Sequence, residues 1–111
     1  MRGSFLVQKD CSILLGENTR CNGFLNISTA EKTSVTIGSG CLIASAVIRS
    51  SDMHPIFDIK TGKRLNHGRN VVIGDDVWLG AESMVLKGSK IGKGVSWLQD
   101  VLFMVILKIT V

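Results

Sequence analysis

A six-residue repeat is the feature of this sequence that most restricts its fold. Four hexads follow one another over residues 73–96: Ile73-Gly-Asp-Asp-Val-Trp, Leu79-Gly-Ala-Glu-Ser-Met, Val85-Leu-Lys-Gly-Ser-Lys and Ile91-Gly-Lys-Gly-Val-Ser. Each begins with an aliphatic residue, and the residue four places later is small or β-branched. This period fits neither an α-helix, with about 3.6 residues per turn, nor the simple alternation of an isolated strand. It predicts a three-sided solenoid in which each hexad forms one short strand and a corner.

In such a solenoid the aliphatic residue points into the prism and the small residue fills the space beside the corner. The glycine that often follows the aliphatic residue permits backbone conformations that a side chain would strain. Successive coils stack at a strand spacing of about 4.8 Å and bury a continuous aliphatic column. The composition agrees, because 12 glycines and 5% aromatic residues suit many tight turns around a narrow aliphatic core.

Weaker copies of the repeat occur upstream. Their aliphatic or small apolar positions are Leu15, Cys21, Ile27, Ile37 and Ile43. The phase changes over residues 28–34, a polar stretch that we interpret as a short loop. The next inward position after residue 43 would be Arg49, which does not belong in an apolar core unless it is paired. We therefore expect the coil to slip here and to turn Ile48 inward instead.

Residues 52–70 leave the repeat entirely. Pro55, Gly62 and Gly68 mark turns within this stretch. We interpret it as a loop that projects from the prism. With 111 residues the chain has room for one domain, so residues 1–111 are expected to form a single all-β unit.

Charge and cysteine content restrict the function. The net charge is +4, but the basic residues are scattered, with neither a groove-reading motif nor interleaved aromatic residues, which disfavours nucleic-acid binding. Three cysteines without C-x-x-C spacing support neither a zinc site nor a disulfide framework, and favour reduced thiols in a cytoplasmic protein. The apolar tail over residues 101–111 is too short to span a bilayer, which needs about 20 residues. The N-terminal apolar run is too short for a signal peptide. The expectation is a soluble protein without membrane insertion.

Three segments carry a resemblance to a known family: Thr36-Ile-Gly-Ser-Gly-Cys-Leu-Ile-Ala-Ser, Asp52-Met-His-Pro-Ile and Val72-Ile-Gly-Asp-Asp-Val-Trp-Leu-Gly-Ala. With these segments the chain resembles the hexapeptide-repeat acyltransferases, in the branch of the maltose, galactoside and capsule or lipopolysaccharide O-acetyltransferases. The resemblance covers roughly residues 15 to 95. It implies a left-handed parallel β-helix, a homotrimer with active sites between subunits, and acetyl transfer from acetyl-CoA to a hydroxyl of a sugar or polysaccharide precursor, without a metal ion.

His54 matches the histidine that serves as general base in this family. An unperturbed imidazole titrates near pH 6.5, so its neutral form is available to accept a proton at cellular pH. Pro55 disfavours a helical conformation at His54. In an extended segment Asp52 and His54 project to the same side, so Asp52 could orient the imidazole. The second histidine, His67, lacks this context and is interpreted as a loop residue.

The resemblance implies further contacts. Trp78 would line the groove between subunits beside the pantetheine arm or the acceptor, or would simply be a trimer contact. The backbone around Gly80 and Ala81 would lie beside the thioester, where an N–H group could stabilise the oxyanion. Lys87 could meet the phosphates of the coenzyme or form part of a solvated charged corner. Asn22 would contact the acceptor.

The C-terminal end departs from the family. From Val95 onward the sequence shows no hexad, and the glycine- and proline-containing segment that closes the family fold is missing. We expect residues 96–111 to be a truncated or altered apolar tail that caps the prism or joins the trimer as a strand. The loss puts coenzyme binding in doubt.

Three alternatives to an active O-acetyltransferase remain at this point. The first is a catalytically impaired trimeric scaffold or binding remnant of the same family, and the second is N-acetylation of an amino sugar. The third is a γ-class carbonic anhydrase, which shares the solenoid but holds zinc through three histidines. With only two histidines the chain does not supply that ligand set.

Overall fold

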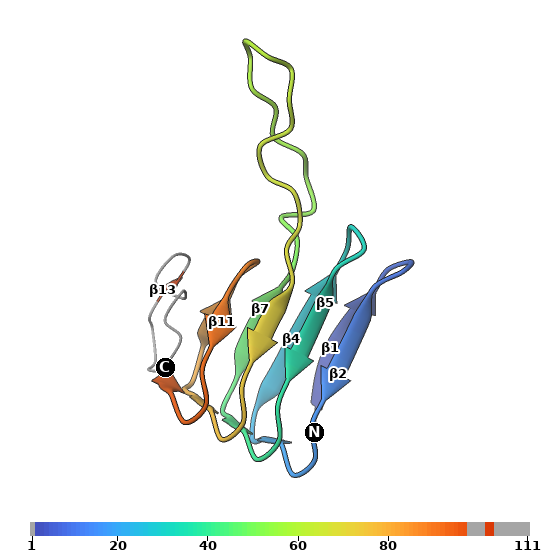
Figure 1. Cartoon of the computed structure of the whole chain (residues 1–111). Helices are drawn as coiled ribbons and strands as arrows, with labels where there is room; N and C mark the ends of the chain where they lie inside the picture. The colour runs from blue at the N-terminus through green and yellow to red at the C-terminus, as the bar shows by residue number, and fades with distance from the viewer. Residues whose placement is uncertain (1, 98–101, 104–111) are drawn as a thin grey trace.

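A computed structural model describes residues 2–97 and 102–103 of the chain. Its strands form three parallel sheets, which we call faces A, B and C, and no helix occurs among the described residues. Strands three apart in the sequence pair with one another, so the chain winds around a common axis. The fold is the expected left-handed parallel β-helix, and its coils stand side by side in Figure 1.

Each face is a ladder of short strands. Face A contains β1 (Arg2–Val7), β4 (Phe24–Thr29), β7 (Ala46–Arg49), β10 (Ser83–Val85) and β13 (Leu102–Phe103). Face B contains β2 (Ser12–Leu15), β5 (Ser34–Ile37), β8 (Val71–Ile73) and β11 (Lys90–Ile91). Face C contains β3 (Arg20–Cys21), β6 (Leu42–Ile43), β9 (Trp78–Leu79) and β12 (Ser96–Trp97).

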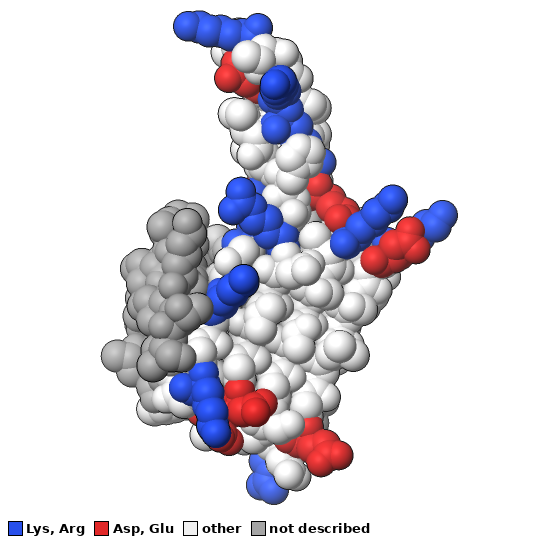
Figure 2. Space-filling model, in the orientation of Figure 1, with Lys and Arg blue, Asp and Glu red and all other residues white. Residues whose placement is uncertain are grey.

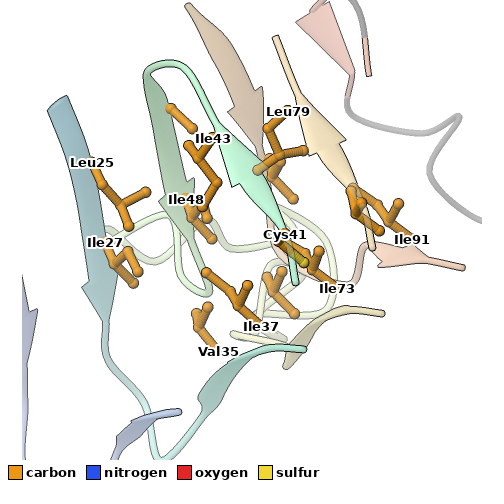
Figure 3. Packing of buried hydrophobic residues seen from close by; sticks show 14 residues of the cluster. Leu25, Ile27, Val35, Ile37, Cys41, Ile43, Ile48, Ile73, Leu79 and Ile91 are labelled. Carbon is orange, nitrogen blue, oxygen red and sulfur yellow. The ribbon is translucent and has the colours of Figure 1, made fainter. Parts of the chain in front are cut away.

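The aliphatic residues of the repeat fill the interior. All four predicted inward residues are buried: Ile73, Leu79, Val85 and Ile91. The register stacks equivalent residues of successive coils, as where Ile37 pairs with Ile73 and Ile73 with Ile91. Figure 3 shows these side chains, together with those of the other faces, converging on one core. The hexad prediction is confirmed.

The loop expected over residues 28–34 is shorter in the structure. Ser28 and Thr29 extend β4 and Ser34 begins β5, so only residues 30–33 form the turn. The hydroxyl of the buried Thr29 finds a partner in the neighbouring strand, since its Oγ1 donates to the carbonyl of Leu6 over 3.1 Å.

The second phase change agrees with the prediction. Ile48 is buried and Arg49 is exposed, so the coil slips by one residue in β7. The slip keeps the charged group outside the core.

Three corners join the faces, and we name them by the faces they connect. The A/B corner contains residues 8–11, 30–33, 50–70 and 86–89; the B/C corner contains residues 16–19, 38–41, 74–77 and 92–95; the C/A corner contains residues 22–23, 44–45 and 80–82. Gly38 at the B/C corner has little room, because a Cβ atom there would lie 2.7 Å from the carbonyl carbon of Gly74 in the next coil. Close stacking of coils, and not a left-handed backbone, is therefore why glycine follows the aliphatic residue here.

The predicted loop is a hairpin that rises far from the prism at the A/B corner (Figure 1). Its two arms meet in an antiparallel bridge between Phe57 and Arg64, and Arg69 N donates to the carbonyl of Ser50 over 2.9 Å at its foot. At the tip Ile59 is 99% exposed. We call residues 50–70 the hairpin.

The coil geometry continues past the last hexad in the sequence. β12 pairs with β9, and β13 pairs with β10, so these dipeptides occupy the next positions on faces C and A. Parallel pairing needs no aliphatic hexad at these positions, which is why the sequence pattern missed them. The remainder of the predicted tail lies outside the described residues. Its expected role, to cap the prism or to join the trimer as a strand, stays a prediction.

Candidate active site

His54 lies near the base of the hairpin, at the A/B corner. The chain leaves β7 through Ser50 and Ser51, both buried, and the Ser51 hydroxyl donates to the carboxylate of Glu31 in the preceding coil. The backbone N–H of Met53 donates to Oγ of Ser51 over 3.0 Å, and Met53 has a left-handed conformation with φ 68°. A side chain makes this conformation costly, so it persists only where surrounding contacts hold it. The backbone that leads into His54 is therefore firmly set.

The Asp52 carboxylate is bound by two partners at the hairpin base. Lys87 Nζ lies 2.7 Å from Oδ2 of Asp52, and Nδ2 of Asn66 donates to the same oxygen over 3.0 Å. The hydrogen bond from Lys87 is the main reason that the pKa of Asp52 lies below its ordinary value, and the bond from Asn66 acts in the same direction. Partial burial opposes this shift and is outweighed.

The Asp52 carboxylate is bonded to residues other than His54, which it was expected to orient. That expectation assumed an extended segment, but the left-handed turn at Met53 interrupts the alternation of side chains. Among the described residues no hydrogen bond joins Asp52 to the ring of His54, and the bonds of Asp52 go to Asn66 and Lys87. The supporting role of Asp52, like the phosphate contact expected of Lys87, stays a prediction.

A second ion pair braces the other arm of the hairpin. Arg64 Nη1 lies 2.6 Å from Oε1 of Glu31, and both side chains are about three-quarters buried. The hydrogen bond from Ser51 is the main reason that the pKa of Glu31 is lowered, with further contributions from the backbone of Gly68 and from Arg64. Beside this pair a cavity of about 200 Å³ is lined in part by Gln8, Glu31, Ser51, Pro55 and Arg64. This depression, whose lining mixes polar and apolar side chains, therefore borders the residue that follows His54.

Asn66 is a residue of this region that the sequence reasoning did not single out. It is buried, and its Nδ2 donates to the backbone carbonyl of His54 over 2.7 Å. The sequence offers only a weak signal for it: it precedes His67, which is exposed as expected for a loop residue, and Gly68, which packs closely against Thr33 and Glu31.

The other predicted residues gather at a different corner. Trp78 lies on the outer side of face C and is 46% exposed, stacked in register above Leu42. Gly80 is buried and Ala81 partly buried at the C/A corner that follows. Asn22 is exposed at the same corner. Residues 22, 44 and 80 stack there in successive coils, linked by backbone hydrogen bonds.

Within one chain, the residues at the C/A corner and His54 at the A/B corner lie apart. Face A separates the C/A corner from the A/B corner, and its central strand β7 (Ala46–Arg49) fills that width. At the rise of an extended chain this is a separation of roughly 15 Å. His54 and Trp78 therefore lie on opposite sides of face A within one chain.

Most of the surface charge lies at the corners and on the hairpin. Figure 2 shows that the wall carrying β2, β5 and β11 is mostly uncharged from this side, apart from a basic group on it; β11 itself carries the exposed Lys90. Within the part of the chain that the structure describes, no three histidine, cysteine, aspartate or glutamate side chains gather as a metal-binding group. The described part of the chain contains no helix that could cross a membrane.

Comparison with known proteins agrees with the resemblance seen in the sequence. The chain is 43% identical over 84 residues to the polysialic acid O-acetyltransferase of Neisseria meningitidis, which covers 74% of this chain and 38% of the relative. It is 37% identical over 89 residues to the polysialic acid O-acetyltransferase of Escherichia coli O1:K1 / APEC, covering 79% of this chain and 29% of the relative. The chain thus spans less than two fifths of the length of these curated relatives. No family model matches it.

A solved structure gives the same result for the fold. The crystal structure of the polysialic acid O-acetyltransferase OatWY superposes with a TM-score of 0.81 at 38% sequence identity, covering 86% of this chain and 45% of the other. Sequence and fold therefore agree on the same group of proteins, and the resemblance is confirmed.

Proposed function

We propose that this chain, which is similar in sequence and fold to the left-handed β-helix O-acetyltransferases, transfers an acetyl group from acetyl-CoA to a hydroxyl of a carbohydrate polymer. The observation that carries the proposal is the 43% identity to a polysialic acid O-acetyltransferase over 84 residues. The geometry supports it, because Asn66 holds the backbone of His54 at the base of the hairpin, and the next residue, Pro55, lines a cavity of about 200 Å³.

His54 supplies the chemistry in this proposal. Its neutral imidazole takes the proton of the acceptor hydroxyl while the oxygen attacks the carbonyl carbon of the thioester. The carbonyl oxygen becomes an oxyanion, and a backbone N–H near Gly80 or Ala81 of a neighbouring copy stabilises it. When the intermediate collapses, the C–S bond breaks, the acetyl ester forms, and the imidazolium returns its proton to the thiolate of coenzyme A.

A homotrimer completes the site. His54 lies at the A/B corner and Trp78 beside the C/A corner, so in this proposal the A/B corner of one copy faces the C/A corner of the next. In that arrangement Trp78 and Lys87 would contact the coenzyme and Asn22 the acceptor. We place the reaction in the cytoplasm, since Cys11, Cys21 and Cys41 are free thiols, as in a reducing compartment.

A transfer assay with a histidine pair tests the proposal. Thiol release from acetyl-CoA is measured with polysialic acid as acceptor, for the unmodified chain, for His54→Ala and for His67→Ala. Loss of a general base lowers the rate by about 10²- to 10⁴-fold, so we expect a drop of that size for His54→Ala. His67→Ala serves as the control, because that histidine is exposed on the same hairpin.

Two results would contradict the proposal. Equal rates for the unmodified chain and His54→Ala would remove the general base. Tight binding of acetyl-CoA without transfer to any carbohydrate acceptor would favour the catalytically impaired scaffold.

A further inference from the structure

Asn66 stands out in the hairpin because it is a buried polar residue in an otherwise exposed segment. Only 7% of its surface is exposed, whereas most of residues 54–70 are open to solvent. Burial of an amide is unfavourable unless its donors and acceptors are satisfied. The hydrogen-bond partners of this side chain therefore matter for the stability of the hairpin base.

The amide of Asn66 makes four hydrogen bonds across the hairpin base. Its Nδ2 donates to the carbonyl of His54 over 2.7 Å and to Oδ2 of Asp52 over 3.0 Å. Its Oδ1 accepts from the backbone N–H of Ile56 over 2.7 Å and from Nε of Arg64 over 3.4 Å. Two of these bonds hold the backbone, one at His54 and one at Ile56.

Two partners of Asn66 are themselves anchored to other coils. Asp52 pairs with Lys87 of the following coil over 2.7 Å, and Arg64 pairs with Glu31 of the preceding coil over 2.6 Å. The amide is thus the centre of a network that links the His54 segment to the prism on both sides. Hydrogen bonds to charged groups are the stronger kind, so this network resists displacement.

We infer that Asn66 is the positioning residue that sets where His54 presents its imidazole. The inference rests on the proposed function, because it concerns the same histidine as general base. A carboxylate could not replace the amide, since it has no proton to donate to the carbonyl of His54 and would place a second negative charge against Asp52. An alanine would leave both backbone groups without this partner.

The test compares two asparagines of the same hairpin. Asn70 accepts a hydrogen bond from the backbone N–H of Ser34 over 2.9 Å at the foot of the hairpin, outside the network. We expect kcat to fall about 10- to 100-fold for Asn66→Ala and Asn66→Asp, because small misplacement of a catalytic group is costly. The KM for acetyl-CoA should stay within about twofold, since misplacing the base impairs the chemical step and not uniform binding. Asn70→Ala should leave both parameters within about twofold of the unmodified chain.

A pH series separates positioning from a loss of folded protein. At low pH the new carboxyl of Asn66→Asp becomes protonated and can again donate a proton, so its kcat relative to the unmodified chain should rise as the pH falls. Asp52 and Arg64 face this position, with Lys87 and Glu31 behind them; the negative charge of Asp52 favours that protonation, and the positive charge of Arg64 opposes it. Asn66→Ala should show no such recovery.

His54→Ala, assayed in parallel, keeps the two hypotheses apart. If His54→Ala loses activity while both Asn66 variants retain the kcat of the unmodified chain, the positioning role is wrong and the proposed function stands. If His54→Ala is as active as the unmodified chain, the proposed function itself fails. If only Asn66→Ala fails to fold, Asn66→Asp and its pH series decide.

Discussion

At the residue scale, the hexad decides which side chains stabilise the prism. Val71 and Val72 are adjacent in β8, yet Val71 is fully buried and Val72 is 40% exposed. Val71 stacks on Val35 of the coil below and belongs to the core cluster, whereas Val72 points outward beside Thr36. Two identical residues thus occupy opposite environments one position apart.

These valines provide a matched test of the core. Val71→Ala removes two buried methyl groups and leaves a cavity, so we expect a loss of about 1.5–3 kcal/mol in the free energy of unfolding. Val72→Ala should cost less than about 0.5 kcal/mol, because surface substitutions usually do. Urea unfolding followed by circular dichroism measures both. Equal losses for the two variants would show that the two side chains do not face opposite sides of the sheet.

The sequence predicts the inward residues but not every corner. Aliphatic residues recur because only they can fill the interior, so Ile73 or Ile48 can be recognised from spacing alone. The fourth position of the hexad takes a left-handed backbone in Asp76, Glu82 and Gly88 alike. These three residues share no side-chain property that spacing could reveal, and the demand comes from the turn itself.

At the scale of the element, the base of the hairpin is held by two carboxylates. Asp52 and Glu31 both have a lowered pKa in the folded chain, owing mainly to hydrogen bonds from Lys87 and Ser51 respectively. A lowered folded pKa contributes stability that is fully present above the ordinary values of 3.8 and 4.5. The contribution shrinks as the pH falls below them and is gone below the folded values.

We therefore expect acid to loosen the hairpin base before it unfolds the prism. Hydrogen exchange of the Met53 and Arg69 amides should accelerate, relative to core amides of β8, as the pH falls below about 4.5. The double variant Glu31→Gln, Asp52→Asn should show a smaller acid-dependent change. Glu82→Gln, at the C/A corner, is the control. A profile identical in the double variant and the unmodified chain would mean that these carboxylates do not hold the hairpin.

The far end of the hairpin can be removed without touching its base. Phe57 and Arg64 form an antiparallel bridge, so replacing residues 58–63 by Asn-Gly would close the arms with a two-residue turn. The removed residues are mostly exposed, and we expect the free energy of unfolding to change by less than about 1 kcal/mol.

The shortened hairpin tests whether its tip selects the acceptor. Loops carry specificity on rigid scaffolds, so we expect the KM for polysialic acid to rise and that for acetyl-CoA to stay the same. Steady-state kinetics with each substrate varied in turn provides the measurement. An unchanged KM for both substrates would place acceptor recognition elsewhere.

The hairpin also shows where sequence reasoning ends. Its extent could be predicted because residues 52–70 break the period and contain Pro55 and two glycines. The ion pairs at its base could not be predicted, because Asp52 and Lys87 are far apart in the sequence and meet only after the coils have stacked. The left-handed Met53 is equally a product of those contacts, since methionine has no preference for that conformation.

At the scale of the whole molecule, the three-sided coil separates the two halves of the candidate site. His54 and Trp78 belong to the same coil but lie on opposite sides of face A. The repeat forces this, because consecutive hexads must occupy different faces. In a closed three-fold ring every copy can offer its histidine corner to one neighbour and its tryptophan corner to the other, which gives equivalent sites.

Mixing two inactive variants distinguishes a shared site from one within a single chain. His54→Ala and Trp78→Ala are each expected to be nearly inactive as homotrimers, since every site then lacks one group. After joint refolding in equal amounts, a site regains both groups when its histidine comes from a Trp78→Ala copy and its tryptophan from a His54→Ala copy. Random assembly in a three-fold ring produces this pairing in about one quarter of sites, so about one quarter of the original activity should return. Variants refolded separately and then combined provide the control, and no recovery after joint refolding would show that each chain carries its own complete site.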